Sequence, residues 1–179
     1  VVKYGLYGGD YREDMEQLWK ALKPCEGLKD TIVVRDGSGS MEARIGGTNV
    51  HAIDISTALA IYCSQYTQSE FKDKFITFSK YAKLVDLSKA GSLKTKLNIC
   101  AKEADCSNTD LENVFDLILQ TAVDNQMKPE EIPSTVLVIS DMEFDPSHES
   151  IGWYGNGHNF SSNIIDSVAR KFKAHGYTL

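Results

Sequence analysis

The chain has 179 residues, of which 42% are hydrophobic and 25% are charged, and its formal net charge is −6. These values indicate one ordinary globular domain and exclude a disordered or fibrous protein. The acidic balance argues against broad binding to a nucleic-acid backbone, which requires clustered Lys and Arg. There is no apolar run near the ~20 residues of a membrane-spanning helix and no secretory start, so we expect an intracellular, cytoplasmic protein without membrane contact.

Four cysteines are present, and none forms a CxxC pair. The close ligand pairs typical of zinc sites are therefore missing. Cys63 falls within an apolar helical pattern, where a buried thiol is the ordinary interpretation. We expect reduced thiols and no zinc site.

The first third of the chain predicts a helix, a buried strand and a second helix. Residues 10–23 have apolar positions at helical spacing, and Asp10 with Glu13 matches a capping box. We expect this helix to pack on the sheet; the alternative is a tether to a domain upstream. Residues 31–35 form a continuous apolar run, which is typical of a parallel strand covered on both faces. The next helix spans residues 50–65.

The helix over residues 50–65 is expected to begin after Thr48 or Asn49, either of which is a suitable cap. Two short strands follow, over residues 75–78 and 81–85. The connection between them is tight, so we predict an antiparallel pair.

Further helices are predicted over residues 93–102 and 111–125, and the run 135–139 is a second strongly buried strand. A last helix spans residues 162–175, with Gly176 as its cap. The positions of that helix expected to face inward are Ile164, Ile165, Val168 and Phe172. The alternation of strands and helices predicts a doubly wound, mostly parallel α/β sheet flanked by helices.

Oxygen-bearing side chains follow both buried strands. The first strand runs into Asp36, and the strand 135–139 runs through Ser140 into Asp141. Parallel neighbours joined by right-handed crossovers end at the same sheet edge, so the two carboxylates should meet at a topological switch point. The loop before the helix at residue 111 brings Thr109 to the same crevice.

The turn after the first strand reads Asp36-Gly-Ser38-Gly-Ser40. One carboxylate and two hydroxyls are hard oxygen ligands that suit Mg²⁺. The competing interpretation is a turn in which these side chains only satisfy backbone donors. Thr109 with Glu112 also matches a capping box, which makes Thr109 the weakest of the candidate ligands.

Together, Asp36, Ser38, Ser40, Thr109 and Asp141 resemble the metal-ion-dependent adhesion site (MIDAS) of a von Willebrand factor A (VWA) domain. The resemblance implies that Mg²⁺ or Mn²⁺ binds the three hydroxyls directly or nearly so and the two carboxylates often through water. The cation would keep an open position for an Asp or Glu of a protein partner. A VWA-like, Rossmann-like fold follows from the same likeness.

A narrower likeness is to an uncharacterised VWA family related to the TROVE (Ro ribonucleoprotein) proteins. It rests on Phe-Ile-Thr-Phe-Ser at residues 75–79, on Asn108-Thr109 leading into residues 114–119, and on residues 140–145. The likeness implies part of a larger ribonucleoprotein-related protein. RNA contact would come only through that parent, because it belongs to a helical-repeat domain that this chain lacks.

The resemblance also divides the chain. We expect residues 1–30 to form an N-terminal segment with an amphipathic helix, and residues 31–179 to form a VWA-like domain that stops where its next strand should begin. The C-terminal strands would then be missing, and the strand 135–139 would be an exposed edge that favours pairing with another chain.

The alternative is an enzyme that resembles the haloacid dehalogenases: a Mg²⁺-dependent phosphohydrolase with Asp36 as nucleophile, Thr77 or Ser79 at the end of the next strand, and Asp141 followed by Asp145. Against it, Ser38 stands where that family has its second Asp. The four histidines are scattered and support no catalytic triad. We therefore expect a binding module, not an enzyme.

The segment 143–161, with Trp153 and Tyr154, is expected to overhang the metal edge. Aromatic residues on such a loop suit partner recognition; packing of Trp153 on the sheet is the equal alternative.

Overall fold

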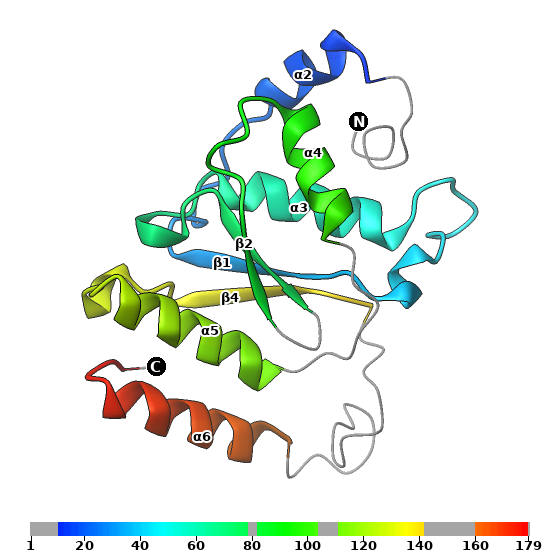
Figure 1. The fold of residues 1–179 in the computed structure, drawn as a ribbon. Coiled ribbons are helices and arrows are strands. Elements are labelled where there is room, and N and C mark those ends of the chain that lie inside the picture. The colour runs from blue at the N-terminus through cyan, green and yellow to red at the C-terminus, as the bar shows by residue number, and fades with distance from the viewer. Residues whose placement is uncertain (1–10, 79–81, 104–110, 142–159, 179) are drawn as a thin grey trace.

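The computed structural model describes residues 11–78, 82–103, 111–141 and 160–178. A four-stranded sheet lies between two layers of helices (Figure 1). The strands are β1 (Thr31–Asp36), β2 (Lys74–Phe78), β3 (Lys83–Asp86) and β4 (Thr135–Ile139). The helices are α2 (Glu13–Lys20), α3 (Ala52–Ser64), α4 (Leu93–Lys102), α5 (Leu111–Asp124) and α6 (Phe160–Ala174). Short 3₁₀ turns occur at Gly39–Glu42, Ser69–Phe71 and Pro129–Glu131.

The strand order is β3-β2-β1-β4. β1 runs parallel to β2 and to β4, whereas β2 and β3 are antiparallel. The chain thus winds outward from β1 to one side and returns to place β4 on the other side. The predicted mixed α/β sheet, with its antiparallel pair and its reversal of direction at β1, is confirmed.

β1 supplies both layers of the core, because successive side chains of a strand point to opposite faces. Ile32 and Val34 join the cluster formed with α5 and α6, while Val33 joins the cluster formed with α3 and α4. All three side chains are fully buried. Burial of each contributes roughly 1.5–3 kcal/mol, so β1 is the most strongly held strand and a rigid base for the residues that follow it.

β4 is less buried than its apolar sequence predicts. Its residues alternate between exposed and half-buried, and Leu137 is 38% exposed. Within the described residues β4 pairs with β1 alone, so it lies at the edge of the sheet, as expected. The prediction of a strongly buried strand over residues 135–139 was wrong, because an apolar run indicates a strand but not how much of it is covered.

Two helix starts also differ from prediction. α3 begins after His51, whose backbone N–H donates to the Asp54 carboxylate over 2.8 Å, and not after Thr48 or Asn49. The Thr48 hydroxyl instead donates to the Ile45 carbonyl within the preceding loop.

At the N-terminal helix, α2 is preceded by Arg12, so the predicted capping box of Asp10 with Glu13 does not form its start. Asp10 itself lies outside the described residues.

α6 packs on α5 through Val168 and Phe172, which are 1% and 2% exposed. Ile165, predicted to face inward, is 51% exposed. Polar contacts reinforce the pair: Lys171 Nζ lies 2.7 Å from Asp116 and 2.9 Å from Glu112. These carboxylates raise the pKa of Lys171. The predicted C-terminal cap is confirmed at Gly176.

Gly176 adopts a left-handed φ of +83° and donates its N–H to Lys173. A side chain would be strained in this conformation.

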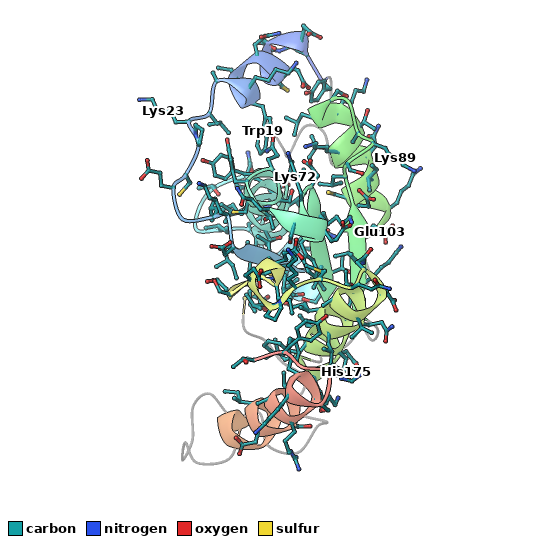
Figure 2. All side chains as sticks on the ribbon, turned by 90° about the vertical axis from the view of Figure 1, so that its left-hand side faces the viewer. Trp19, Lys23, Lys72, Lys89, Glu103 and His175 are labelled. Atoms are coloured by element: carbon teal, nitrogen blue, oxygen red, sulfur yellow. The ribbon has the colours of Figure 1, made fainter. Side chains whose placement is uncertain are left out.

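α2 docks on the body of the domain through a buried carboxylate. Glu16 is 6% exposed and accepts hydrogen bonds from the Tyr11 hydroxyl at 2.6 Å and from the Leu93 N–H at the start of α4 at 2.9 Å. Burial alone would raise the pKa of Glu16, but these bonds hold it below its ordinary value. Trp19 lies on the inner side of α2 in Figure 2, edge-on to Tyr62. The helix therefore packs on the α3–α4 layer and not directly on the sheet.

No helix within the described ranges has both the length and the apolar character needed to cross a membrane.

Candidate metal centre

Asp36 ends the central strand and is held from two directions. Its side chain is 1% exposed. One carboxylate oxygen accepts the Ser38 N–H at 2.8 Å, and the other accepts the Ser140 hydroxyl at 2.5 Å. The second bond follows from the register, because Arg35 pairs with Ile139 and the next residues of the two strands are therefore neighbours. The carboxyl ends of β1 and β4 meet at this carboxylate, as predicted.

Ser38 and Ser40 present their hydroxyls beside Asp36. The two Oγ atoms are 3.0 Å apart, and both residues are half-buried. The short 3₁₀ turn Gly39–Glu42 keeps them on one side, and Met41, only 2% exposed, fixes that turn to the protein interior. The structure thus places these three polar side chains of the turn side by side.

The spacing of the hydroxyls fits a magnesium ion. In an octahedron with metal–oxygen bonds of about 2.1 Å, adjacent ligands lie about 3.0 Å apart. Ser38 and Ser40 already have this separation. It is also the length of a hydrogen bond, so the two hydroxyls satisfy each other without a cation. Ser38 and Ser40 could therefore bind Mg²⁺ as adjacent ligands without a change in their separation.

The other two candidate ligands are placed less completely. Asp141 is exposed and directly follows Ser140, so its Cα lies about 3.8 Å from that of the residue bonded to Asp36. Thr109 lies outside the described residues, which leave out 104–110. The structure thus brings together Asp36, Ser38, Ser40 and the end of β4.

The charge at this edge is low for a metal site. In the part of the chain that the structure describes, no three His, Cys, Asp or Glu side chains come together in a metal-binding arrangement. The candidate set depends instead on neutral hydroxyl oxygens, with Asp36 as its buried carboxylate. Such a set would leave most of the charge of a divalent cation uncompensated.

Ser140 contributes to this centre, although its place in the sequence indicates only the end of a strand. Its hydroxyl donates the hydrogen bond that links the end of β4 to Asp36. The signal in the sequence is a serine directly before Asp141, at the sheet edge where Asp36 also lies. The register of the two strands was needed to see that Ser140, and not Asp141, is the direct neighbour.

Arg35 was also missed, since a polar residue at a strand end is usually exposed. It is 1% exposed and donates to the Thr57 hydroxyl at 3.1 Å and to the Glu103 carbonyl at 3.1 Å. Its guanidinium lies 5.5 Å from the centre of the Phe75 ring. Burial lowers its pKa. Arg35 thus holds the C-terminal end of α4 against the strand that carries Asp36.

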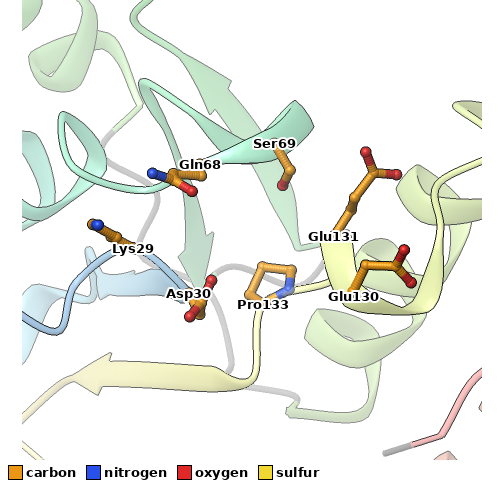
Figure 3. Close-up of a pocket in the computed structure, with 7 residues that line it drawn as sticks. All are labelled: Lys29, Asp30, Gln68, Ser69, Glu130, Glu131 and Pro133. Carbon is orange, nitrogen blue, oxygen red and sulfur yellow. The ribbon is translucent and has the colours of Figure 1, made fainter.

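A cavity of about 210 Å³ lies at the opposite end of the sheet (Figure 3). Asp30, just before β1, and Pro133, just before β4, line it together with Glu130 and Glu131. The carboxylates are exposed, and Glu131 already accepts the Lys128 N–H at 2.7 Å. This cavity is unrelated to the candidate centre, because parallel strands carry their ligands at the carboxyl edge.

The segment 143–159 with Trp153, as well as Ser79 and Asp145 of the phosphohydrolase alternative, lies outside the described residues.

Comparison with solved structures finds no significant match. The chain is similar to the uncharacterized protein L728 of Acanthamoeba polyphaga mimivirus, with 28% identity over 184 residues. The alignment covers 97% of this chain but 28% of the viral protein, so the chain spans less than a third of that relative. A family described as a domain of unknown function, DUF7788, matches residues 30–179. The match includes all the strands and every candidate ligand, and the chain therefore belongs to the DUF7788 family.

Proposed function

We propose that this protein is a binding module that captures an acidic side chain of a protein partner through a bound Mg²⁺ or Mn²⁺ ion. The observation that carries the proposal is the convergence at Asp36: a buried carboxylate bonded to the Ser38 N–H and the Ser140 hydroxyl, beside two hydroxyls 3.0 Å apart. Ser38 and Ser40 would bind the cation, together with Thr109, and Asp36 and Asp141 would act mainly through water.

The roles follow from the chemistry of the donors. A divalent ion held by neutral hydroxyls remains electron-poor, so it attracts an anionic oxygen from outside the protein. Both oxygens of Asp36 already accept hydrogen bonds, which suits a carboxylate that orients a metal-bound water. Binding of the partner would thus be reversible and would depend on the metal.

The order of the strands supports the VWA-like fold as part of this proposal. The strand order β3-β2-β1-β4, with the reversal beside β1, agrees with the first four strands of the doubly wound order 3-2-1-4-5-6. We further propose a cytoplasmic setting in a larger protein, with RNA reached only through a parent ribonucleoprotein.

Thermal unfolding with chelator, Mg²⁺ or Mn²⁺ tests the proposal. Wild type should melt at a higher temperature with metal, because a ligand at a hundredfold excess over its Kd stabilises the folded state by about 2.7 kcal/mol. Asp36→Asn should lose this response while it keeps the size of the side chain. Asp86→Asn is the matched control, since Asp86 accepts the Ser88 N–H in a similar turn at 2.7 Å. An equal metal response in the two variants would contradict the proposal.

The same protein should be tested for turnover of p-nitrophenyl phosphate. The phosphohydrolase alternative needs an accessible nucleophilic oxygen, whereas Asp36 is 1% exposed with both oxygens engaged. We expect a metal response without turnover. Metal-dependent hydrolysis that disappears in Asp36→Asn would favour the enzyme instead.

A further inference from the structure

A small hairpin, residues 43–51, follows the turn that carries Ser40. Arg44 and His51 form an antiparallel bridge, and the Ile45 N–H donates to the Val50 carbonyl at 2.8 Å. The Thr48 hydroxyl closes the loop by donating to the Ile45 carbonyl at 2.6 Å. These bonds give the hairpin a defined conformation.

The hairpin is fixed at its base, next to the turn that carries Ser40, because the Ala43 N–H donates to the Ser40 carbonyl at 2.9 Å. Ile45 lies five positions after Ser40, so their Cα atoms are at most about 17 Å apart. At the other end the Ala52 N–H donates to the Ala43 carbonyl at 3.1 Å, and His51 caps α3. Figure 1 shows this segment, in cyan, projecting beyond the carboxyl end of β1.

The hairpin exposes a pair of aliphatic side chains. Because Arg44 pairs with His51, Ile45 lies opposite Val50, and directly opposite residues share one face with Cβ atoms about 5 Å apart. Ile45 is 42% exposed and Val50 is 37% exposed. Neither belongs to the two buried core clusters of the described residues. Both side chains are therefore accessible to another molecule.

We propose that Ile45 and Val50 form an aliphatic recognition site for the same partner segment whose carboxylate binds the metal. The segment it fits is an extended peptide with an acidic residue and an aliphatic residue within about five positions of it, since about 17 Å corresponds to about five extended residues. This inference rests on the proposed function.

The overall charge favours an aliphatic contribution to binding. A net charge of −6 repels an acidic segment at long range. Short-range contacts must therefore overcome that repulsion. The cation supplies one, and burial of the aliphatic pair supplies a second that does not depend on charge.

The test uses fluorescein-labelled peptides of Gly and Ser with one central Asp, with or without a Leu placed one to five residues away. Binding is measured by fluorescence anisotropy in Mg²⁺ and in EDTA. In Mg²⁺ the best-placed Leu should tighten binding about fivefold or more. This corresponds to about 1 kcal/mol of binding free energy from apolar burial. The double variant Ile45→Thr/Val50→Thr keeps β-branching and should reduce that preference below about twofold.

Two controls separate the possible failures. Leu18→Gln removes an aliphatic side chain that is 62% exposed on α2 and should leave the Leu preference intact. The double variant should retain the wild-type Mg²⁺ shift in melting temperature without peptide. A wild-type protein without Leu preference, or a preference that survives the double variant, overturns the inference alone. If Mg²⁺ does not raise the melting temperature of the wild-type protein, the proposed function is overturned, and this inference with it.

Discussion

Two turns of this protein share a local structure and differ in what surrounds them. At the end of β1 the Ser38 N–H donates to Asp36 at 2.8 Å, and at the end of β3 the Ser88 N–H donates to Asp86 at 2.7 Å. Asp36 is 1% exposed, whereas Asp86 is exposed. Asp36 also accepts a hydrogen bond from the Ser140 hydroxyl at the end of a second strand.

The comparison shows that an Asp-x-Ser turn specifies the backbone but not a site. β3 is an edge strand, so the turn at Asp86 faces solvent on the side away from β2. β1 is flanked on both sides, so its turn meets the end of β4. The position of the strand in the sheet converts a common turn into a place where several oxygen donors converge.

The largest difference should appear when the carboxylates are removed. Asp36→Ala removes the buried acceptor of the half-buried Ser38 N–H and of the Ser140 hydroxyl, and should lower the free energy of unfolding by about 2–4 kcal/mol. Asp86→Ala should cost about 1 kcal/mol or less, because water replaces the lost bond. Urea unfolding in EDTA measures both values. Equal losses of unfolding free energy would show that the two carboxylates contribute equally to stability.

Ser140→Ala removes only the contact that distinguishes the two turns. One oxygen of Asp36 loses its donor from β4, and we expect a loss of about 1–2 kcal/mol in the same urea measurement. Ser88→Ala keeps the backbone donor of the Asp86 turn and should cost about 0.5 kcal/mol or less. A Ser140→Ala protein as stable as wild type would mean that the bridge between the strands contributes little.

Ser38→Ala should separate folding from metal binding. The backbone bond to Asp36 remains, so stability in EDTA should change by about 0.5 kcal/mol or less. Loss of one ligand should weaken Mg²⁺ binding about tenfold or more, which removes about 1.4 kcal/mol of the metal-dependent stabilisation. Titration calorimetry with MgCl₂ gives the affinity, with Ser88→Ala as the matched control. Unchanged affinity would remove Ser38 from the ligand set.

The smallest expected effect concerns pH. The hydrogen bond with Ser88 holds the pKa of Asp86 below its ordinary value. A depressed pKa means that this stabilisation is present above about pH 4 and is lost as the pH falls through the folded-state pKa. Because the group is exposed, we expect less than about 1 kcal/mol. Asp86→Asn should therefore flatten the decline of stability below pH 4; a decline identical to that of wild type would contradict this assignment.

Much of the fold could be predicted because its strands and helices are strongly patterned. The predicted strand 135–139 and the predicted helix 93–102 match β4 and α4 to the residue. β1 is one residue longer than predicted, because it includes Asp36. The errors concern properties that depend on neighbours. The exposure of Leu137 depends on which elements cover β4, and that of Ile165 depends on the rotation of α6 against α5.

The candidate centre was predictable as a set of residue types but not as a network. The acidic strand ends and the hydroxyls of the turn are visible in the sequence, and the parallel arrangement brings Asp36 to the end of β4. The role of Ser140 required the register. The role of Arg35 required knowledge of where α4 ends, because two of its acceptors are carbonyls about 65 residues away in the chain.

The docking of α2 bears on where this domain can be divided. The family match starts at residue 30, yet Glu16 supplies the acceptor for the Leu93 N–H at the head of α4. Cutting the polypeptide at the boundary of family similarity would strip that amide of its acceptor and uncover the apolar surface beneath Trp19. The packed unit thus extends further toward the N-terminus than the region of family similarity, and expression trials should retain the preceding helix.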